Sequence, residues 1–287
     1  MSQTIRNILP WIFSIGACAA ALALPSAAAS AANLEVEFDA DNFPNPTVIT
    51  NPYWPLISGS SFVYYAEGED GCEVGQTTVL SSTKDDFAGE YGENDFEALE
   101  VKDREWLSEE CDGEYILIED TIDWYAQDDG GNVWYLGENT VAYDDEEECL
   151  TSAGSWEAGS DVADVGSNAE AGIVMLAEPV NGLAYPQEFY EDEAEDFGKV
   201  LQTNAAVSLE FLETDYAGCL KTKEWTPLER GQVEHKFYCP PDGLVLVNEL
   251  SGGKTLRVEL VGDSTGNVPG ENDFADEFPV SEECPAD

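Results

Sequence analysis

Apolar and polar residues alternate over short stretches along most of the chain, and turn-forming residues separate these stretches. The alternation is present at 116–127, 132–138 and 200–211, and further strands are predicted at 62–66, 74–82, 96–106 and 255–261. Side chains of a β-strand point alternately to opposite faces of a sheet, so the pattern predicts strands. No helix of ten or more residues is evident after the N-terminal segment. We predict an all-β domain of about a dozen strands, forming a single large antiparallel curved sheet or an open barrel of half-barrel or lipocalin-like kind.

The strongest hairpin signal lies at 116–138, where Asp129-Gly130 separates two alternating runs. An Asp-Gly pair suits a two-residue type I′ turn, because both central residues need positive φ. Large aromatic side chains fall on both faces of this hairpin, which indicates that it is covered on both sides or lines a cavity. The turn predicts three cross-strand pairs: Ala126 with Val133, Tyr125 with Trp134, and Trp124 with Tyr135.

A second hairpin is predicted at 216–238, with its turn at 226–231. This register places Cys219 opposite Cys239, Glu224 opposite Glu234, and Lys223 opposite His235. Basic residues are concentrated here, and we expect local ion pairs in which Lys236 and Lys223 neutralise the two glutamates. Between the two hairpins, residues 160–183 are interpreted as a long ordered loop laid across the sheet.

The first 31 residues have the features of a secretory signal peptide. Arg6 supplies a positive charge, residues 8–24 are apolar, and Ala29-Ser30-Ala31 offers a small-residue cleavage site. We expect export to the periplasm or the extracellular space. The alternative is a lipoprotein anchored at Cys18, whose surroundings loosely resemble a lipobox. No later segment is apolar enough to span a bilayer, so we expect no integral membrane segment after signal removal.

Six cysteines follow the signal segment, and an even number in an exported chain predicts three disulfides. Loops on either side of a meander strand pair lie at the same end of the sheet, which favours Cys72 with Cys111. The second hairpin favours Cys219 with Cys239. Cys149 and Cys284 are then paired by elimination.

The formal net charge of −49 argues against nucleic-acid binding and against adhesion to anionic membranes. Acidic residues spread along the whole chain favour a solvated acidic surface. The alternative is binding of Ca²⁺ by the hard oxygens at 128–132 and 143–148, although neither run fits the spacing of an EF-hand. We predict the all-β domain at 34–262 and an acidic, largely irregular tail at 263–287.

The leading functional hypothesis is an exported, non-enzymatic protein that binds a small apolar or carbohydrate ligand in an aromatic-lined concavity. The competing hypotheses are a glycosidase-like hydrolase using a carboxylate pair, and an acidic structural protein of the cell surface. A structural role for the paired aromatics as sheet-stabilising contacts is favoured over a role in ligand binding. No nucleophile motif or phosphate-binding loop is present, and oligomeric state is left open. The candidate ligand-binding residues are Asp123, Tyr125, Gln127, Trp134, Trp156, Glu157, Glu224, Trp225, Glu234 and His235.

Several strings resemble a group of uncharacterised exported bacterial proteins. They are DWYAQDxxGNVWYxGE at 123–138, GSWEAG at 154–159, AGIVM at 171–175, YPQEFYEDEAED at 185–196 and KEWTPLERGQVEHKFY at 223–238. The resemblance covers roughly residues 43–250 and implies export without implying an activity. Cys239 departs from the pattern of the group, in agreement with a local disulfide to Cys219.

Overall fold

Fifteen β-strands and three short 3₁₀-helices form the part of the chain that the computed structural model describes, residues 34, 37–69 and 71–285. The 3₁₀-helices are η1 (Ala40–Asn42), η2 (Gly89–Asp95) and η3 (Thr265–Asn267). The strands are β1 (Ser61–Glu67), β2 (Cys72–Lys84), β3 (Ala98–Ser108), β4 (Glu114–Gln127), β5 (Val133–Asp144), β6 (Cys149–Thr151), β7 (Trp156–Glu157), β8 (Glu170–Met175), β9 (Ala184–Tyr190), β10 (Ala194–Leu209), β11 (Thr214–Trp225), β12 (Val233–Cys239), β13 (Gly243–Ser251), β14 (Lys254–Gly262) and β15 (Asp273–Phe274).

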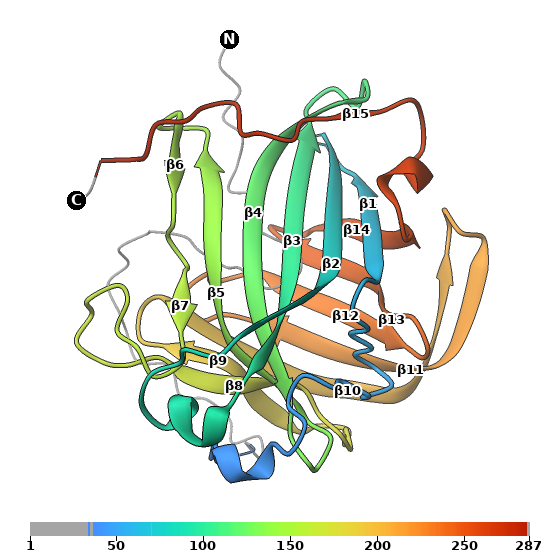
Figure 1. Cartoon of the computed structure of the whole chain (residues 1–287). Helices are drawn as coiled ribbons and strands as arrows, with labels where there is room; N and C mark the ends of the chain where they lie inside the picture. The colour runs from blue at the N-terminus through green and yellow to red at the C-terminus, as the bar shows by residue number, and fades with distance from the viewer. Residues whose placement is uncertain (1–33, 35–36, 70, 286–287) are drawn as a thin grey trace.

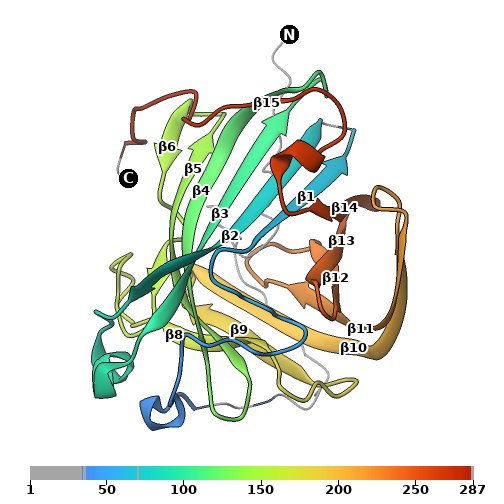
Figure 2. The same ribbon diagram turned by 45° about the vertical axis from the view of Figure 1, so that its right-hand side comes forward.

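The long strands join into one sheet that curves into a ring. Pairing runs β4-β3-β2-β1-β14-β13-β12-β11-β10-β9-β8-β5, and β5 pairs again with β4, so the path closes. Strands β1 to β5 lie in front in Figure 1, and β8 to β14 cross behind them; Figure 2 shows the same two layers from a second direction. The predicted all-β fold on one large curved sheet is confirmed.

The first hairpin forms from β4 and β5, but its predicted register is wrong by one residue. Tyr125 pairs with Tyr135, and the loop spans residues 128–132 instead of two residues. The Asp128 carboxylate accepts hydrogen bonds from the backbone N–H of Asn132 at 2.8 Å and from the Trp134 indole at 2.9 Å. These bonds hold the loop at 128–132 in place of the predicted two-residue turn.

Both faces of this hairpin are covered, as the sequence predicts. Tyr125 and Tyr135 stack with ring centroids 4.9 Å apart on one face. On the other face, Phe38 and Phe43 from the N-terminal lead-in pack against Trp134, with centroid distances of 5.6 and 5.9 Å. The shifted register therefore places the two tyrosines on the same face.

The second hairpin has the predicted register, with Glu224 opposite Glu234 in β11 and β12. All three predicted disulfides, Cys72–Cys111, Cys149–Cys284 and Cys219–Cys239, are present. The interpretation of 160–183 as a loop is incomplete, because β8 lies within it. Strand β8 is hard to recognise from the sequence because it is short and its apolar residues do not alternate with polar ones. Its pairing also needs glycine at position 172, where a Cβ would lie 2.3 Å from the Gln187 backbone.

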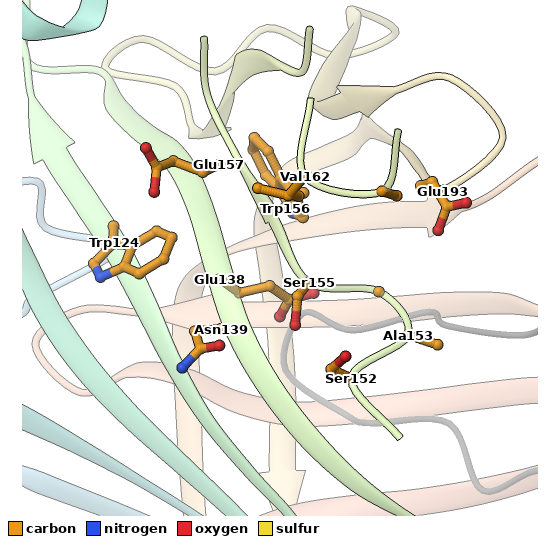
Figure 3. A pocket seen from close by; sticks show the side chains of 12 residues that line it. Trp124, Glu138, Asn139, Ser152, Ala153, Ser155, Trp156, Glu157, Val162 and Glu193 are labelled. Atoms are coloured by element: carbon orange, nitrogen blue, oxygen red, sulfur yellow. The ribbon is translucent and has the colours of Figure 1, made fainter. Parts of the chain in front are cut away.

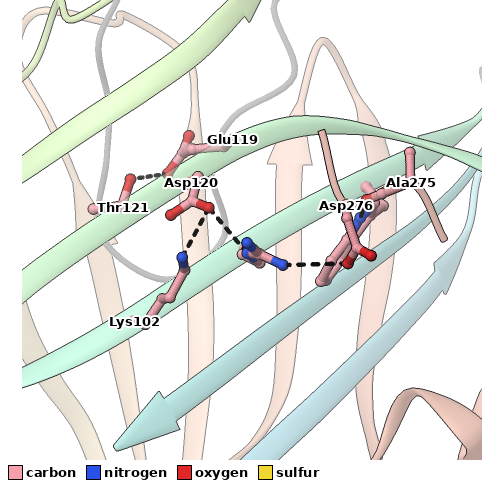
Figure 4. Close-up of polar contacts among 8 residues, drawn as sticks. Lys102, Glu119, Asp120, Thr121, Ala275 and Asp276 are labelled. Atoms are coloured by element: carbon pink, nitrogen blue, oxygen red, sulfur yellow. Dashed lines mark hydrogen bonds and ion pairs between the residues drawn. The ribbon is translucent and has the colours of Figure 1, made fainter. Parts of the chain in front are cut away.

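The C-terminal segment packs across β3 and β4. Strand β15 runs parallel to β4, and the Trp106 indole donates a 2.8 Å hydrogen bond to the Ala275 carbonyl. Asp120 binds both Lys102 at 3.0 Å and Arg104 at 2.9 Å, and Arg104 reaches Asp276 at 3.8 Å (Figure 4). This segment, predicted to be largely irregular, is thus fastened by hydrogen bonds and a disulfide.

The predicted signal peptide and the alternative anchor at Cys18 lie outside the described residues. Within the part of the chain that the structure describes, no helix has both the length and the apolar character needed to cross a membrane.

Candidate functional site

Carboxyl groups are concentrated on the face of the sheet that points into the ring. Cross-strand pairing places Asp123 beside Glu138, and Glu188 beside Asp196, on one continuous face. This face is the inner one, because Trp54 contacts Tyr125 of β4 at 6.0 Å and Tyr238 of β12 at 5.5 Å, although these strands are far apart in the ring. We define the inner carboxyl cluster as Asp103, Glu119, Asp123, Glu138, Glu188, Asp196, Glu224 and Glu234, with Lys236 among them.

Burial raises the pKa of several carboxyl groups in this cluster. Burial raises the pKa of Asp103 to about 7 and that of Glu119 to about 8. Burial, and then the charge of neighbouring Asp103, raises the pKa of Asp123 well above its ordinary value. The Tyr135 hydroxyl lies 2.7 Å from Asp123 and 3.1 Å from Glu138, and a protonated carboxyl can satisfy the second of these contacts. Carboxyl groups in this region therefore exchange protons near neutral pH.

Lys236 holds the predicted glutamate pair together. Its amine lies 3.1 Å from Glu224 and 2.9 Å from Glu234. Glu224 also accepts a hydrogen bond from the Tyr238 hydroxyl at 2.8 Å. The expectation that Lys223 joins in neutralising the pair is wrong, because Lys223 points to the opposite face and lies over the Trp225 ring. This ion-paired and hydrogen-bonded group is built for stability more than for reactivity.

A cleft of about 550 Å³ opens beside β5, and we call it the side cleft. Strands β6 and β7 both pair with β5, and residues 152–155 between them swing away from the sheet. The backbone N–H of Thr140 donates to the Ser155 hydroxyl at 3.0 Å, which fixes the base of this segment. Figure 3 shows the lining side chains, which are Trp124, Glu138, Asn139, Ser152, Ala153, Ser155, Trp156, Glu157, Val162, Ala163 and Glu193 together with Gly154.

The side cleft forms only because β7 approaches β5 very closely. Gly137 has φ of +129°, and a Cβ there would lie 2.3 Å from the Trp156 carbonyl oxygen. A larger residue would push β7 away and displace Trp156 from the cleft wall. Glycine at this position therefore sets the shape of the cleft.

The cleft combines two indoles with hydroxyl, amide and carboxyl groups. Lys84 lies 4.9 Å from the Trp124 ring and 3.1 Å from Glu157, so it fixes the position of both. Glu138 is buried at the inner wall, where burial and the charge of Glu188 raise its pKa well above the ordinary value. The cleft thus meets the inner carboxyl cluster at Glu138.

The structure divides the candidate residues from the sequence among three places. Asp123, Tyr125, Glu224 and Glu234 lie on the inner face, and Trp156 and Glu157 line the side cleft. Trp134, Trp225 and His235 lie outside both, and Gln127 continues the inner-facing positions of Asp123 and Tyr125 at the end of β4. Gln127 accepts hydrogen bonds from the backbone of Thr50 and Asn51 at 2.7 and 2.9 Å, which is a structural contact.

Sequence reasoning missed the cleft residues Trp124, Asn139, Ser152 and Ser155 as a group. Trp124 and Asn139 project from neighbouring long strands, but the serines belong to a segment whose pairing with β5 has no local signal. Glu188 and Asp196 were missed among many similar acids. Within the described residues, no group of three or more metal-ligating side chains is placed to hold a metal ion.

No protein-family model and no curated protein matches this sequence. Two solved structures are similar. One is a Bacteroides fragilis NCTC 9343 protein with a YmcC-like fold that is proposed to be exported, with 11% identity, 74% coverage of this chain, 98% coverage of that chain and a TM-score of 0.33. The other is a Parabacteroides distasonis ATCC 8503 protein proposed to be a lipoprotein. It has 10% identity, 73% coverage of this chain, 97% coverage of that chain and a TM-score of 0.33. Likeness at this level carries no argument about the function of this chain.

Proposed function

We propose that this chain is an exported, non-enzymatic protein that binds a small neutral carbohydrate in the side cleft. The observation that carries the proposal is the meeting of two indole side chains, two serine hydroxyls and an asparagine amide on one cavity of about 550 Å³. Cavities of this size accommodate small-molecule ligands. The three disulfides agree with residence in an oxidising compartment.

The chemistry of the lining favours a sugar over a purely apolar ligand. An indole such as Trp124 offers an apolar surface for the C–H face of a sugar ring. Asn139 and the serines both donate and accept hydrogen bonds, as hydroxyl groups require. Glu138, Glu157 and Glu193 also line the cleft, so a negatively charged sugar would be disfavoured.

A panel of neutral mono- and oligosaccharides tests the proposal through tryptophan fluorescence and titration calorimetry. We expect saturable binding that Trp124→Ala weakens at least about tenfold, or about 1.4 kcal/mol, and that Asn139→Ala weakens about three- to tenfold, or about 0.7–1.4 kcal/mol. Trp225→Phe is the matched control, because Trp225 stacks on Phe197 outside the cleft. Failure of every sugar to bind, or unchanged affinity in both cleft variants, would refute the proposal.

One observation favours hydrolysis of the bound sugar as a second candidate function. Glu138, whose pKa burial raises well above its ordinary value, lines the same cleft as Glu157, which is held by Lys84. Glycoside hydrolysis uses a pair of carboxyl groups beside the sugar, and a raised pKa is typical of the one that acts as the general acid. Turnover of aryl glycosides that Glu138→Gln abolishes, with sugar binding retained, would establish this activity in place of simple binding.

A further inference from the structure

A second pocket, on the outer face of the ring, has the opposite charge character from the rest of the molecule. It encloses about 510 Å³ between the β11–β12 and β13–β14 turns. Its lining is Lys223, Gly231, Val233, His235, Leu250, Gly252, Gly253, Lys254 and Thr255, and contains no acidic residue. The chain carries 60 acidic residues and 11 lysines and arginines, so a pocket with two lysines, a histidine and no carboxylate is strongly enriched in hydrogen-bond donors.

We propose that this pocket, which we call the outer pocket, binds a small molecule through an oxyanion group such as a carboxylate, sulfate or phosphate. The site would be separate from the side cleft and independent of the function proposed for it.

The lysines are arranged to meet an incoming anion. Lys223 lies 4.7 Å from the Trp225 ring centroid, and neighbouring Lys221 lies 5.0 Å from the Phe237 ring centroid. Among the ion pairs of the described residues, neither lysine has a carboxylate partner, so their charges are not neutralised in place. The aromatic rings fix the position of the two ammonium groups without cancelling their charge.

The turn between β13 and β14 supplies further donors. Gly252 and Gly253 have φ of +56° and +82°, and neither would meet another atom within 4 Å if it carried a Cβ. Successive glycines in such a turn can present backbone N–H groups to an anion. Lys254 follows directly, and its exposed ion pair with Glu69 is of a kind that contributes little stability and is readily exchanged for a ligand.

The charge distribution around the outer pocket favours a small anion over a long polyanion. At physiological salt the field of a charge decays over about 8 Å, so the local lysines dominate within the pocket. A long polyanion would also cover the acidic surface beyond the pocket, where a net charge of −49 repels it.

His235 gives a direct readout of occupancy, because it is the only histidine of the chain. Burial, followed by the charges of Lys221 and Lys223, lowers the pKa of His235 below its ordinary value. An anion in the outer pocket would offset the charges of the two lysines and raise the pKa of His235. The measurement is an NMR titration of the imidazole in sodium sulfate against sodium chloride at equal ionic strength, with parallel titrations in phosphate, and in glucuronate against glucose.

We expect sulfate, phosphate or glucuronate to raise the pKa of His235 by about 1 unit beyond chloride, and glucose to have no effect. Lys223→Gln should weaken the response about fivefold or more, and Lys254→Gln should weaken it less. Lys102→Gln is the matched control, because Lys102 binds Asp120 on β4.

Responses confined to glucuronate identify a sugar acid, and responses to sulfate and phosphate as well identify a general oxyanion site; both support the proposal. Equal pKa values in all salts, or an unchanged response in Lys223→Gln, would overturn it. A response that follows protein concentration instead of added anion would also overturn it, because the acidic surface of a second copy would then be the occupant.

Discussion

Replacement of Lys236 should lower the free energy of unfolding, because its charge offsets the repulsion between two buried carboxylates. Its ammonium group lies between Glu224 and Glu234, and the three side chains are 5%, 6% and 9% exposed. Burial alone would lower the pKa of Lys236, but the two adjacent carboxylates raise it above its ordinary value. The lysine therefore stays charged and balances two groups that would otherwise repel each other across the β11–β12 pair.

Replacing Lys236 with methionine keeps most of the side-chain volume and removes the charge together with its hydrogen-bond donors. Two buried carboxylates then face each other without a cation, and breaking a buried ion pair in this way costs about 3–5 kcal/mol. Urea unfolding at pH 7 measures the change in the free energy of unfolding. Lys102→Met is the control, because Lys102 forms a more exposed ion pair and should cost no more than about 1 kcal/mol.

The pH dependence of this loss is a second check on the same reasoning. Burial already raises the pKa of Glu234, and removal of Lys236 raises it further. Protonation relieves the repulsion, so the cost of Lys236→Met should shrink when the pH falls from 7 to 5. Adding Glu234→Gln to Lys236→Met should recover much of the loss at pH 7. A cost below about 1 kcal/mol at pH 7, or a cost that grows in acid, would refute the electrostatic account.

Two further predictions concern the wild-type pH profile and the first hairpin. Because burial raises the pKa of Asp103 to about 7 and of Glu119 to about 8, the folded chain holds protons that the unfolded chain releases, so the free energy of unfolding should fall as the pH rises from about 4 to 8. The shift of Asp103 from 3.8 to about 7 corresponds to about 4 kcal/mol, and urea unfolding that shows greater stability at pH 8.5 than at pH 5 would contradict it. Asp128→Ala should cost about 2 kcal/mol by leaving the buried Trp134 indole unpaired, whereas Asp129→Ala, in the same loop, should be nearly neutral by thermal unfolding.

Local sequence patterns were sufficient for the fold class and for the second hairpin. The spacing of Cys219 and Cys239 about a turn at 226–231 fixed both the disulfide and the pairing of Glu224 with Glu234. The predicted register of the first hairpin was wrong because the loop is held by the Asp128 side chain. Its hydrogen bond to the Trp134 indole cannot be predicted from turn propensities.

The candidate site was only partly predictable, and the reason is the pairing of distant segments. Trp156 and Glu157 were recognised as candidates, but their place beside Trp124 depends on β7 pairing with β5. The inner carboxyl cluster had no local signal at all. With 60 acidic residues in the chain, only the register around the ring distinguishes a buried acid such as Glu188 from an exposed one.

The closure of the ring through β4 and β5 bears on how the protein behaves at high concentration. A strand with an unpaired edge is a template for pairing with another chain, and long exposed edges promote aggregation. In the described part of the chain, the strands at the ends of the pairing path are β6 and β15, of three and two residues, and the side strand β7 has two. Most long strands are hydrogen-bonded on both sides, but β10 pairs with β9 only over Ala194–Lys199 and β11 pairs with β12 only from Leu220 onward. The far half of the β10–β11 hairpin is therefore the place in the described structure where pairing with another chain would begin.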